Sequence, residues 1–140
     1  MPVPDLDDWR RRWQRPILQR LGIRGDTVEH GYARMRVDRP EDADELLFRS
    51  SLTIAADLAA ISAVTSQLED GVQVANGTAE LHLSFIDTPG GLPDAVEVSA
   101  HVANWADYAT HLEVEARSPG GELLARALTT YSLRPVAETS

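Results

Sequence analysis

The stretch from Ser50 to Leu68, SSLTIAADLAAISAVTSQL, contains a single ionisable residue, Asp57. At roughly 1.5 Å per residue, this stretch is long enough for about five helical turns. Because it is apolar on every face apart from Asp57 and a few hydroxyls, we expect this helix to be surrounded by the rest of the protein and not to lie on its surface. An ionised carboxylate is strongly disfavoured in such a place, so Asp57 should reach a polar crevice or take up a proton. Both environments are typical of a catalytic acid or base.

The segment before this run is expected to be helical and then extended. Trp9 and Trp13 are spaced four residues apart, which indicates a helical segment over residues 5–22 that Pro16 interrupts. Apolar and polar residues alternate over residues 27–37, which predicts a first strand.

The central helix is expected at about 50–68, with Ser50 or Ser51 as its N-cap and the acidic stretch 38–47 as a loop before it. Alternation and glycine-proline turns after the helix predict antiparallel strands, over residues 71–75, 78–86, 95–104, 108–118 and 122–133. Because only a curved sheet can hide a helix that is apolar all round, the sequence predicts one α+β domain spanning 1–140. A single sheet of this size covers such a helix incompletely, so a second copy is expected to complete it, as a homodimer or homotetramer.

The residue types that are missing exclude several kinds of chemistry. All 13 basic residues are arginine, which excludes Schiff-base formation on lysine and P-loop nucleotide binding. The absence of cysteine excludes thiol nucleophiles, thiolate metal sites and disulfides. The spacing of the four histidines fits no metal motif, so we expect no metal ion and no separate cofactor.

The charge distribution limits the partners. The net charge is −9, while residues 1–24 carry an excess of arginine over aspartate, and the acidic remainder argues against nucleic acid as a partner. The arginine-rich first helix could hold one phosphate group or an acidic partner, or it could be a solvated face. No secretory signal opens the chain, and the polar residues of the central helix argue against a membrane span, so we expect a cytoplasmic protein.

Several stretches of the chain, in their order and spacing, are similar to one family. They are PILQRLGIR before the first strand, GYARMRV within it, LTIAADLAA on the central helix, GTAELHLSFIDTPG in the middle strand and LEVEARSPGGELLARALTTYSL in the closing hairpin. From Pro16 to Leu133 the chain resembles the hotdog-fold thioesterase superfamily, in its phenylacetyl-coenzyme A thioesterase-like branch. The resemblance implies a hotdog fold, in which a curved antiparallel sheet wraps one long helix, and an activity on acyl thioesters.

The resemblance also implies a catalytic role for Asp57, which falls on the position of the family's nucleophile or general base. In the family a His-Gly-Gly motif usually opens the helix, where a glycine amide and the helix N-terminus stabilise the thioester oxyanion. Phe48, Arg49 and Ser50 stand in its place here, and the amides of Ser50 and Ser51 could substitute for the lost glycines. These four residues are therefore candidate substrate-binding residues.

Two further residues extend the candidate site. Asp42 stands where relatives often place an asparagine that orients substrate or water, so Asp42 and Asp57 could divide the acid and base roles. Equally, Asp42 could be one more charge in a solvated loop. Ser50, Thr53 and Asp57 form a polar line along one helix face, which suggests that Thr53 also borders the cleft. Alternatively, Thr53 bonds back to the backbone and an arginine at a subunit interface neutralises Asp57.

The sequence leaves three functions open. The first is hydrolysis of an acyl-coenzyme A or acyl-carrier-protein thioester, with coenzyme A or phosphopantetheine as part of the substrate. This chain lacks both the His-Gly-Gly motif and the basic residue that relatives carry where it has residues 104–108. For the first function, this favours a carrier-bound acyl group. It also favours the second function, which is that of a non-hydrolytic ligand-binding protein. The third is a hotdog enzyme of secondary metabolism that adds to or dehydrates an enoyl thioester.

Overall fold

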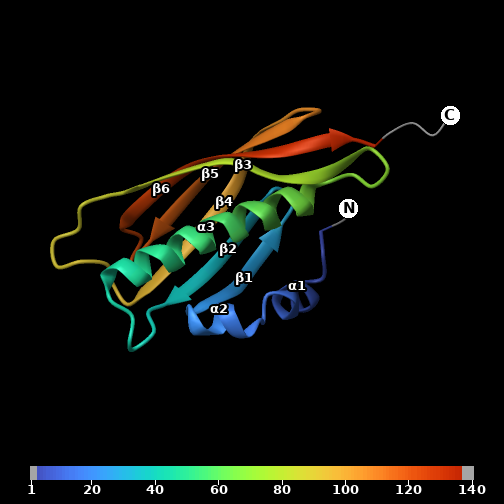
Figure 1. Ribbon diagram of the computed structural model, residues 1–140. Coiled ribbons are helices and arrows are strands. Elements are labelled where there is room, and N and C mark those ends of the chain that lie inside the picture. Colours follow the sequence, from blue (N-terminus) through green and yellow to red (C-terminus); the bar gives the residue numbers. More distant parts are fainter. Residues whose placement is uncertain (1–2, 137–140) are drawn as a thin grey trace.

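One antiparallel sheet and one long helix form the centre of the structure, a computed structural model that describes residues 3–136. The strands lie in the order β1-β2-β4-β5-β6-β3, and each is antiparallel to its neighbours. The sheet curves around α3, while α1 and α2 lie beside β1, across α3 from β3 (Figure 1). The expected α+β architecture, a curved antiparallel sheet around a long helix, is confirmed. In chain order the elements are α1 (Leu6–Arg12), α2 (Pro16–Arg20), β1 (Ile23–Glu29), β2 (Tyr32–Asp38), α3 (Glu45–Gln67), β3 (Gln73–Phe85), β4 (Ala95–Trp105), β5 (Ala109–Arg117) and β6 (Leu123–Pro135).

Small side chains allow α3 to lie close to the sheet. The opposite face of the helix is uncovered, as the exposure of Leu46 (75%) and Ile54 (38%) shows. The expectation that one sheet covers the helix incompletely is therefore confirmed. By length and composition alone α3 could also cross a bilayer, but 56% of that stretch is buried inside the protein, as in the core helix of a globular domain. Five alanines are at most 1% exposed, namely Ala55, Ala56, Ala59, Ala60 and Ala63.

The start of α3 differs from the prediction. The helix begins at Glu45 and not at Ser50, and its N-cap is Asp44, whose carboxylate accepts a 2.8 Å hydrogen bond from the amide of Leu47. An aspartate is among the best N-cap residues, and an acidic residue in the first turn suits the helix dipole. The end of the acidic stretch therefore starts the helix, and Ser50 and Ser51 lie inside it.

The predicted first strand is a hairpin of two strands. The chain turns between β1 and β2 at Gly31, which has a φ of 72° and donates a 2.9 Å hydrogen bond from its amide to Ser66 Oγ. Glycine adopts this conformation without steric cost, whereas other residues rarely do. Inward-facing side chains of β2 are fully buried as the alternation predicted, including Met35 and Val37, so the strand was recognised and its boundary was wrong.

The two short strands predicted after the helix are one strand, β3. Its ladder with β6 shifts register between Ala75 and Gly77 and again between Thr78 and Glu80. Bulges of this kind interrupt the period-two pattern, which is why the sequence suggested two strands. β3 ends the sheet, so within the described chain its outer edge pairs with no strand.

Candidate active site

Asp57 lies on the uncovered face of α3, beside β3. Its side chain is partly buried, and Thr78 Oγ1 donates a 2.7 Å hydrogen bond to Asp57 Oδ1. Within residues 3–136 no donor reaches Oδ2, and no arginine pairs with this carboxylate. The carboxylate therefore occupies a polar, partly solvated place, one of the two environments that the sequence predicted.

Tyr131 and Thr78 are neighbours of Asp57 that the sequence did not indicate. They lie opposite each other in the ladder between β6 and β3. Tyr131 is 6% exposed, and this burial, followed by the negative charge of Asp57, raises the pKa of its hydroxyl. Tyr131 therefore stays protonated at neutral pH and keeps a donor near the carboxylate. The proximity of Thr78 and Tyr131 to Asp57 depends on strand register, which local sequence patterns do not encode.

The hydroxyls of Ser50 and Thr53 are used inside the helix. Ser50 Oγ donates to the carbonyl of Leu46 at 3.1 Å, and Thr53 Oγ1 donates to the carbonyl of Arg49 at 3.0 Å. Both residues lie toward the uncovered side of α3, as Asp57 does. The bond that Thr53 makes to the backbone is the one that the alternative interpretation of this residue predicted.

Phe48 and Ser51 point into the core. Both are 0% exposed, and no hydrogen-bond partner within the described chain reaches Ser51 Oγ. The guanidinium of Arg39 lies over the Phe48 ring, 4.5 Å from its centroid. In the single chain neither side chain has free surface for a substrate, so the structure gives both a packing role.

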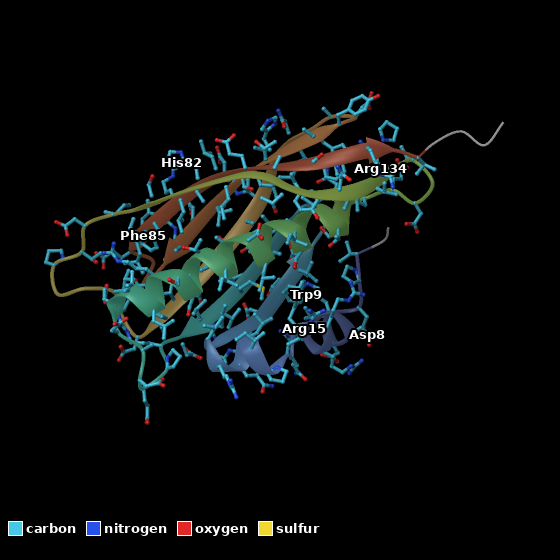
Figure 2. The ribbon with its side chains drawn as sticks, viewed as in Figure 1. Asp8, Trp9, Arg15, His82, Phe85 and Arg134 are labelled. Carbon is cyan, nitrogen blue, oxygen red and sulfur yellow. The ribbon has the colours of Figure 1, made fainter. Side chains whose placement is uncertain are left out.

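Arg49 remains accessible on the uncovered side of the helix. Its guanidinium lies 4.9 Å from the ring centroid of Phe85, at the end of β3 (Figure 2). A cation over an aromatic face is held by the quadrupole of the ring, yet keeps its N–H groups at the ring edge available. Of the residues that replace His-Gly-Gly, Arg49 therefore offers the charged group that a ligand could reach.

Solved structures with the same arrangement include thioesterases. A thioesterase from Haemophilus influenzae has a TM-score of 0.70 at 12% identity, covering 96% of this chain and 94% of its own. A probable thioesterase from Pseudomonas aeruginosa has a TM-score of 0.76 at 19% identity, covering 97% of this chain and 99% of its own. PaaI from the phenylacetic acid degradation operon of E. coli has a TM-score of 0.68 at 18% identity, covering 92% of this chain and 90% of its own.

The chain has the hotdog fold. This confirms the fold that the sequence resemblance implied. No protein-family model matches the chain, and no curated protein matches it. The assignment to the phenylacetyl-coenzyme A thioesterase-like branch therefore stays a prediction.

The central helix of this hotdog fold does not offer the amides of Ser50 and Ser51 to a substrate. Inside an α-helix each backbone N–H bonds to the carbonyl four residues earlier. The prediction that these two residues form the helix N-terminus is wrong, because Asp44 caps the helix more than one turn earlier. The free amides of this N-terminus belong to its first turn, at Glu45 and Leu46.

Asp42 and Asp57 are not brought together within one hotdog chain. Asp42 is exposed in the turn that precedes α3. From residue 45 to residue 57 the helix rises about 18 Å, at roughly 1.5 Å per residue. The two carboxylates could therefore share a site only if they came from different copies of the chain.

Three of the four histidines, His82, His101 and His111, lie on strands of the sheet. Within residues 3–136 no group of three or more His, Cys, Asp or Glu residues could hold a metal ion. His101 Nε2 lies 3.1 Å from the carboxylate of Glu113, and His111 Nδ1 lies 2.7 Å from Asn104 Oδ1. His82 points away from α3, on the outer face of the sheet (Figure 2).

Proposed function

We propose that this hotdog protein is an acyl-thioester hydrolase in which Asp57 is the general base. The observation that carries the proposal is the position of Asp57 on the uncovered face of α3, where it is the one ionisable residue between residues 50 and 68. Its Oδ1 accepts a hydrogen bond from Thr78, and within residues 3–136 no donor reaches its Oδ2. The fold is shared with named thioesterases, which supports the same class of reaction.

The proposed reaction is a hydrolysis. Asp57 Oδ2 takes a proton from water while the water oxygen forms a bond to the thioester carbonyl carbon. The carbon–sulfur bond then breaks, and the proton passes to the departing thiolate, so that a carboxylic acid and a thiol are released. Tyr131 keeps its proton beside this site and can donate a hydrogen bond to the water or to the oxyanion. The substrate carries its own coenzyme A or phosphopantetheine, so no separate cofactor is needed.

We further propose that the site is completed by a second copy. What supports a dimer is the free edge of β3 next to the uncovered face of α3, where Ile54 is exposed. A long unpaired strand edge is a template for pairing with another chain. In a two-fold dimer each Asp57 could meet Asp42 and the first-turn amides of the other copy's helix. Sedimentation equilibrium that gave a monomer at every concentration would contradict this arrangement.

The test of the hydrolase uses thiol release from a panel of acyl-coenzyme A and acyl-carrier-protein substrates. Because the chain contains no cysteine, a thiol-reactive dye reports only the released thiol. We expect Asp57→Asn to lower kcat by roughly 10²–10⁴-fold, the usual contribution of a general base. Glu122→Gln, which changes an exposed carboxylate near the β5–β6 turn, is the matched control and should keep full activity. Equal turnover by Asp57→Asn and the unchanged protein would refute the proposal.

A second candidate is a non-hydrolytic ligand-binding protein on the same fold. The observation that favours it is the position of Ser50 and Ser51 inside α3, where the helix uses their amides and does not offer them to an oxyanion beside Asp57. This candidate predicts saturable binding of an acyl thioester without thiol release. Turnover above background that Asp57→Asn abolishes would exclude it.

A further inference from the structure

Arg49 and Asp57 belong to one line of side chains on α3, on the side of the helix that faces β3. With Thr53 between them they are spaced four residues apart, and residues at this spacing are neighbours along a helix face. Both ends of the line touch β3, because Asp57 accepts a hydrogen bond from Thr78 and Arg49 lies against Phe85. From residue 49 to residue 57 the helix rises about 12 Å, at roughly 1.5 Å per residue. A cation therefore lies about two helical turns from the carboxylate that is proposed to activate water.

Apolar side chains of β3 lie along the strand between these two contacts. Leu81 and Leu83 flank His82, which points away from α3 (Figure 2), so both leucines face the helix. They are partly buried and pack against the core, and Phe85 continues the same face of the strand. The stretch between the guanidinium and the carboxylate is therefore apolar, which suits a hydrocarbon chain.

The guanidinium of Arg49 pairs with no acidic side chain in the described part of the chain. It makes no hydrogen bond there either, and its contact with the Phe85 ring leaves its N–H groups unused. The carboxylate one helical turn before it, that of Glu45, is bonded at both oxygens, since Oε2 accepts from Arg39 and Oε1 accepts from the Leu92 amide. A free guanidinium matches a carboxylate or a phosphate, to which it can donate two parallel hydrogen bonds.

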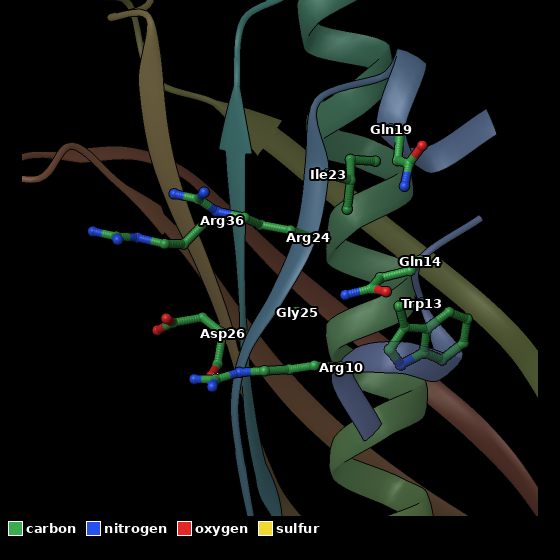
Figure 3. Close-up of a pocket in the computed structure, with 9 residues that line it drawn as sticks. All are labelled: Arg10, Trp13, Gln14, Gln19, Ile23, Arg24, Gly25, Asp26 and Arg36. Carbon is green, nitrogen blue, oxygen red and sulfur yellow. The ribbon is translucent and has the colours of Figure 1, made fainter. Parts of the chain in front are cut away.

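The arginines beside β1 do not offer a comparable arrangement. Arg24 and Arg36 lie on one side of β1, and the ring of Trp13 lies on the other (Figure 3). Both arginines also have an acidic partner, Asp38 at 3.6 Å and Glu97 at 3.1 Å. The unpaired cation next to apolar side chains on the β3 side of α3 is therefore the better site for an amphipathic anion.

We propose that the thioester substrate carries a carboxylate at the far end of its acyl chain, and that Arg49 binds this carboxylate while Asp57 activates water at the thioester. The inference rests on the proposed hydrolase and adds the class of acyl group, which is a dicarboxylic acid joined to the thiol at one end. The acyl chain lies along the apolar side chains of β3. Charge fixes its direction, because the reverse orientation places the free carboxylate beside Asp57, where like charges repel.

A phosphate of the thiol portion is the other anion that a substrate could present to Arg49. In coenzyme A and in carrier proteins a phosphopantetheine arm separates this phosphate from the sulfur atom. The extended arm is longer than the two helical turns between Asp57 and Arg49, so the geometry favours the carboxylate of the acyl chain.

The first test compares thioesters that differ only at the end of the acyl chain. Suberyl-coenzyme A and octanoyl-coenzyme A have the same number of acyl carbons, and the unchanged protein should hydrolyse the suberyl thioester with a kcat/KM about tenfold higher or more. Arg49→Gln should lower this preference about tenfold or more, and Arg49→Lys, which keeps the charge without the planar fork, should retain part of it. Arg12→Gln removes an exposed arginine of α1 and should change the preference less than about twofold.

Thioesters of N-acetylcysteamine distinguish the carboxylate from the phosphate, because they contain no phosphate. The preference for the suberyl over the octanoyl group, and its loss in Arg49→Gln, should persist with them. Arg49→Gln could instead weaken both coenzyme A thioesters alike and leave both N-acetylcysteamine thioesters unchanged. In that case Arg49 binds the phosphate and the proposal is overturned.

Binding measured without turnover separates this inference from the hydrolase. In the Asp57→Asn background, isothermal titration calorimetry should give suberyl-coenzyme A a Kd about tenfold lower than that of octanoyl-coenzyme A, and adding Arg49→Gln should remove the difference. If the unchanged protein releases thiol from no substrate, the hydrolase fails, and the calorimetric preference still decides the role of Arg49. Equal affinities for the two thioesters, or equal effects of Arg49→Gln and Arg12→Gln, overturn the proposal.

Discussion

Gly25 and Trp9 pack so closely that a methyl group at Gly25 has no room. A Cβ atom there would lie 2.9 Å from Cζ3 and 3.0 Å from Cη2 of Trp9. The ring cannot move away freely, because it is 2% exposed and its Nε1 donates a 3.1 Å hydrogen bond to Ser62 Oγ. Overpacking of this kind costs about 1–3 kcal/mol. Alanine in place of glycine restricts the unfolded chain and returns about 0.4–1 kcal/mol, so we expect Gly25→Ala to destabilise the protein by roughly 1–2 kcal/mol.

A double-mutant cycle isolates this contact. Trp9→Phe should itself cost about 1–3 kcal/mol, since it removes the hydrogen bond and part of the buried ring. It also removes the two carbon atoms that the new methyl group would meet. In the Trp9→Phe background Gly25→Ala should therefore be neutral or stabilising by up to about 1 kcal/mol, which gives a coupling energy of at least about 1 kcal/mol.

Urea unfolding followed by far-ultraviolet circular dichroism measures all four proteins at one fixed concentration, so that any association affects them equally. The free energy of unfolding at each corner of the cycle gives the coupling energy directly. If Gly25→Ala cost the same in both backgrounds, the reasoning from the Trp9 contact would be refuted.

Two further changes test the start of α3. Ser51→Ala should raise the free energy of unfolding by up to about 1 kcal/mol, because it removes a buried hydroxyl without a partner; a loss of stability in urea would show that the hydroxyl is bonded. A hydrogen bond from Arg39, and then one from the Leu92 amide, lower the pKa of Glu45 below its ordinary 4.5. The stability that ionised Glu45 contributes to the folded protein is therefore present above about pH 4.5. It is lost as the pH falls through the lower pKa that Glu45 has in the folded state. Glu45→Gln should be less stable than the unchanged protein near neutrality, by less than about 1 kcal/mol because the carboxylate is 39% exposed to solvent. The two proteins should be equally stable in acid, and a difference that persisted there would contradict this cause.

Much of the fold follows from patterns that are local in the sequence. The alternation over residues 108–118 predicted the strand that the structure shows as β5. The apolar residues of this alternation face inward, since Leu112, Val114 and Ala116 are at most 4% exposed. The predictions failed at boundaries. The alternation ran on across the turn at Gly31, and the charge of the acidic stretch concealed Asp44 as the cap of α3.

The candidate site could be predicted only in part. Asp57 was found because a single charged residue in an apolar stretch can be recognised from the sequence alone. Thr78 and Tyr131 were not found, because they meet Asp57 only through the register of β3 on β6 and the way this pair curves over α3. Phe48 was proposed because it stands in the place of the motif's histidine, and Ser51 because its amide was expected at the helix N-terminus. Helix geometry turns both side chains toward the sheet.

The hydrogen bonds from Arg10 to the carbonyl of Asp26 have a consequence for assembly. The sheet has two ends, β1 and β3, and contact between β1 of one copy and β3 of the next would be head-to-tail and could extend into a filament. Arg10 occupies an acceptor on the β1 edge, and α1 and α2 lie against the same strand. The N-terminal segment thus protects the β1 edge from pairing with another strand. Two copies that joined through β3 would have only their protected β1 edges exposed, and assembly would stop at the dimer.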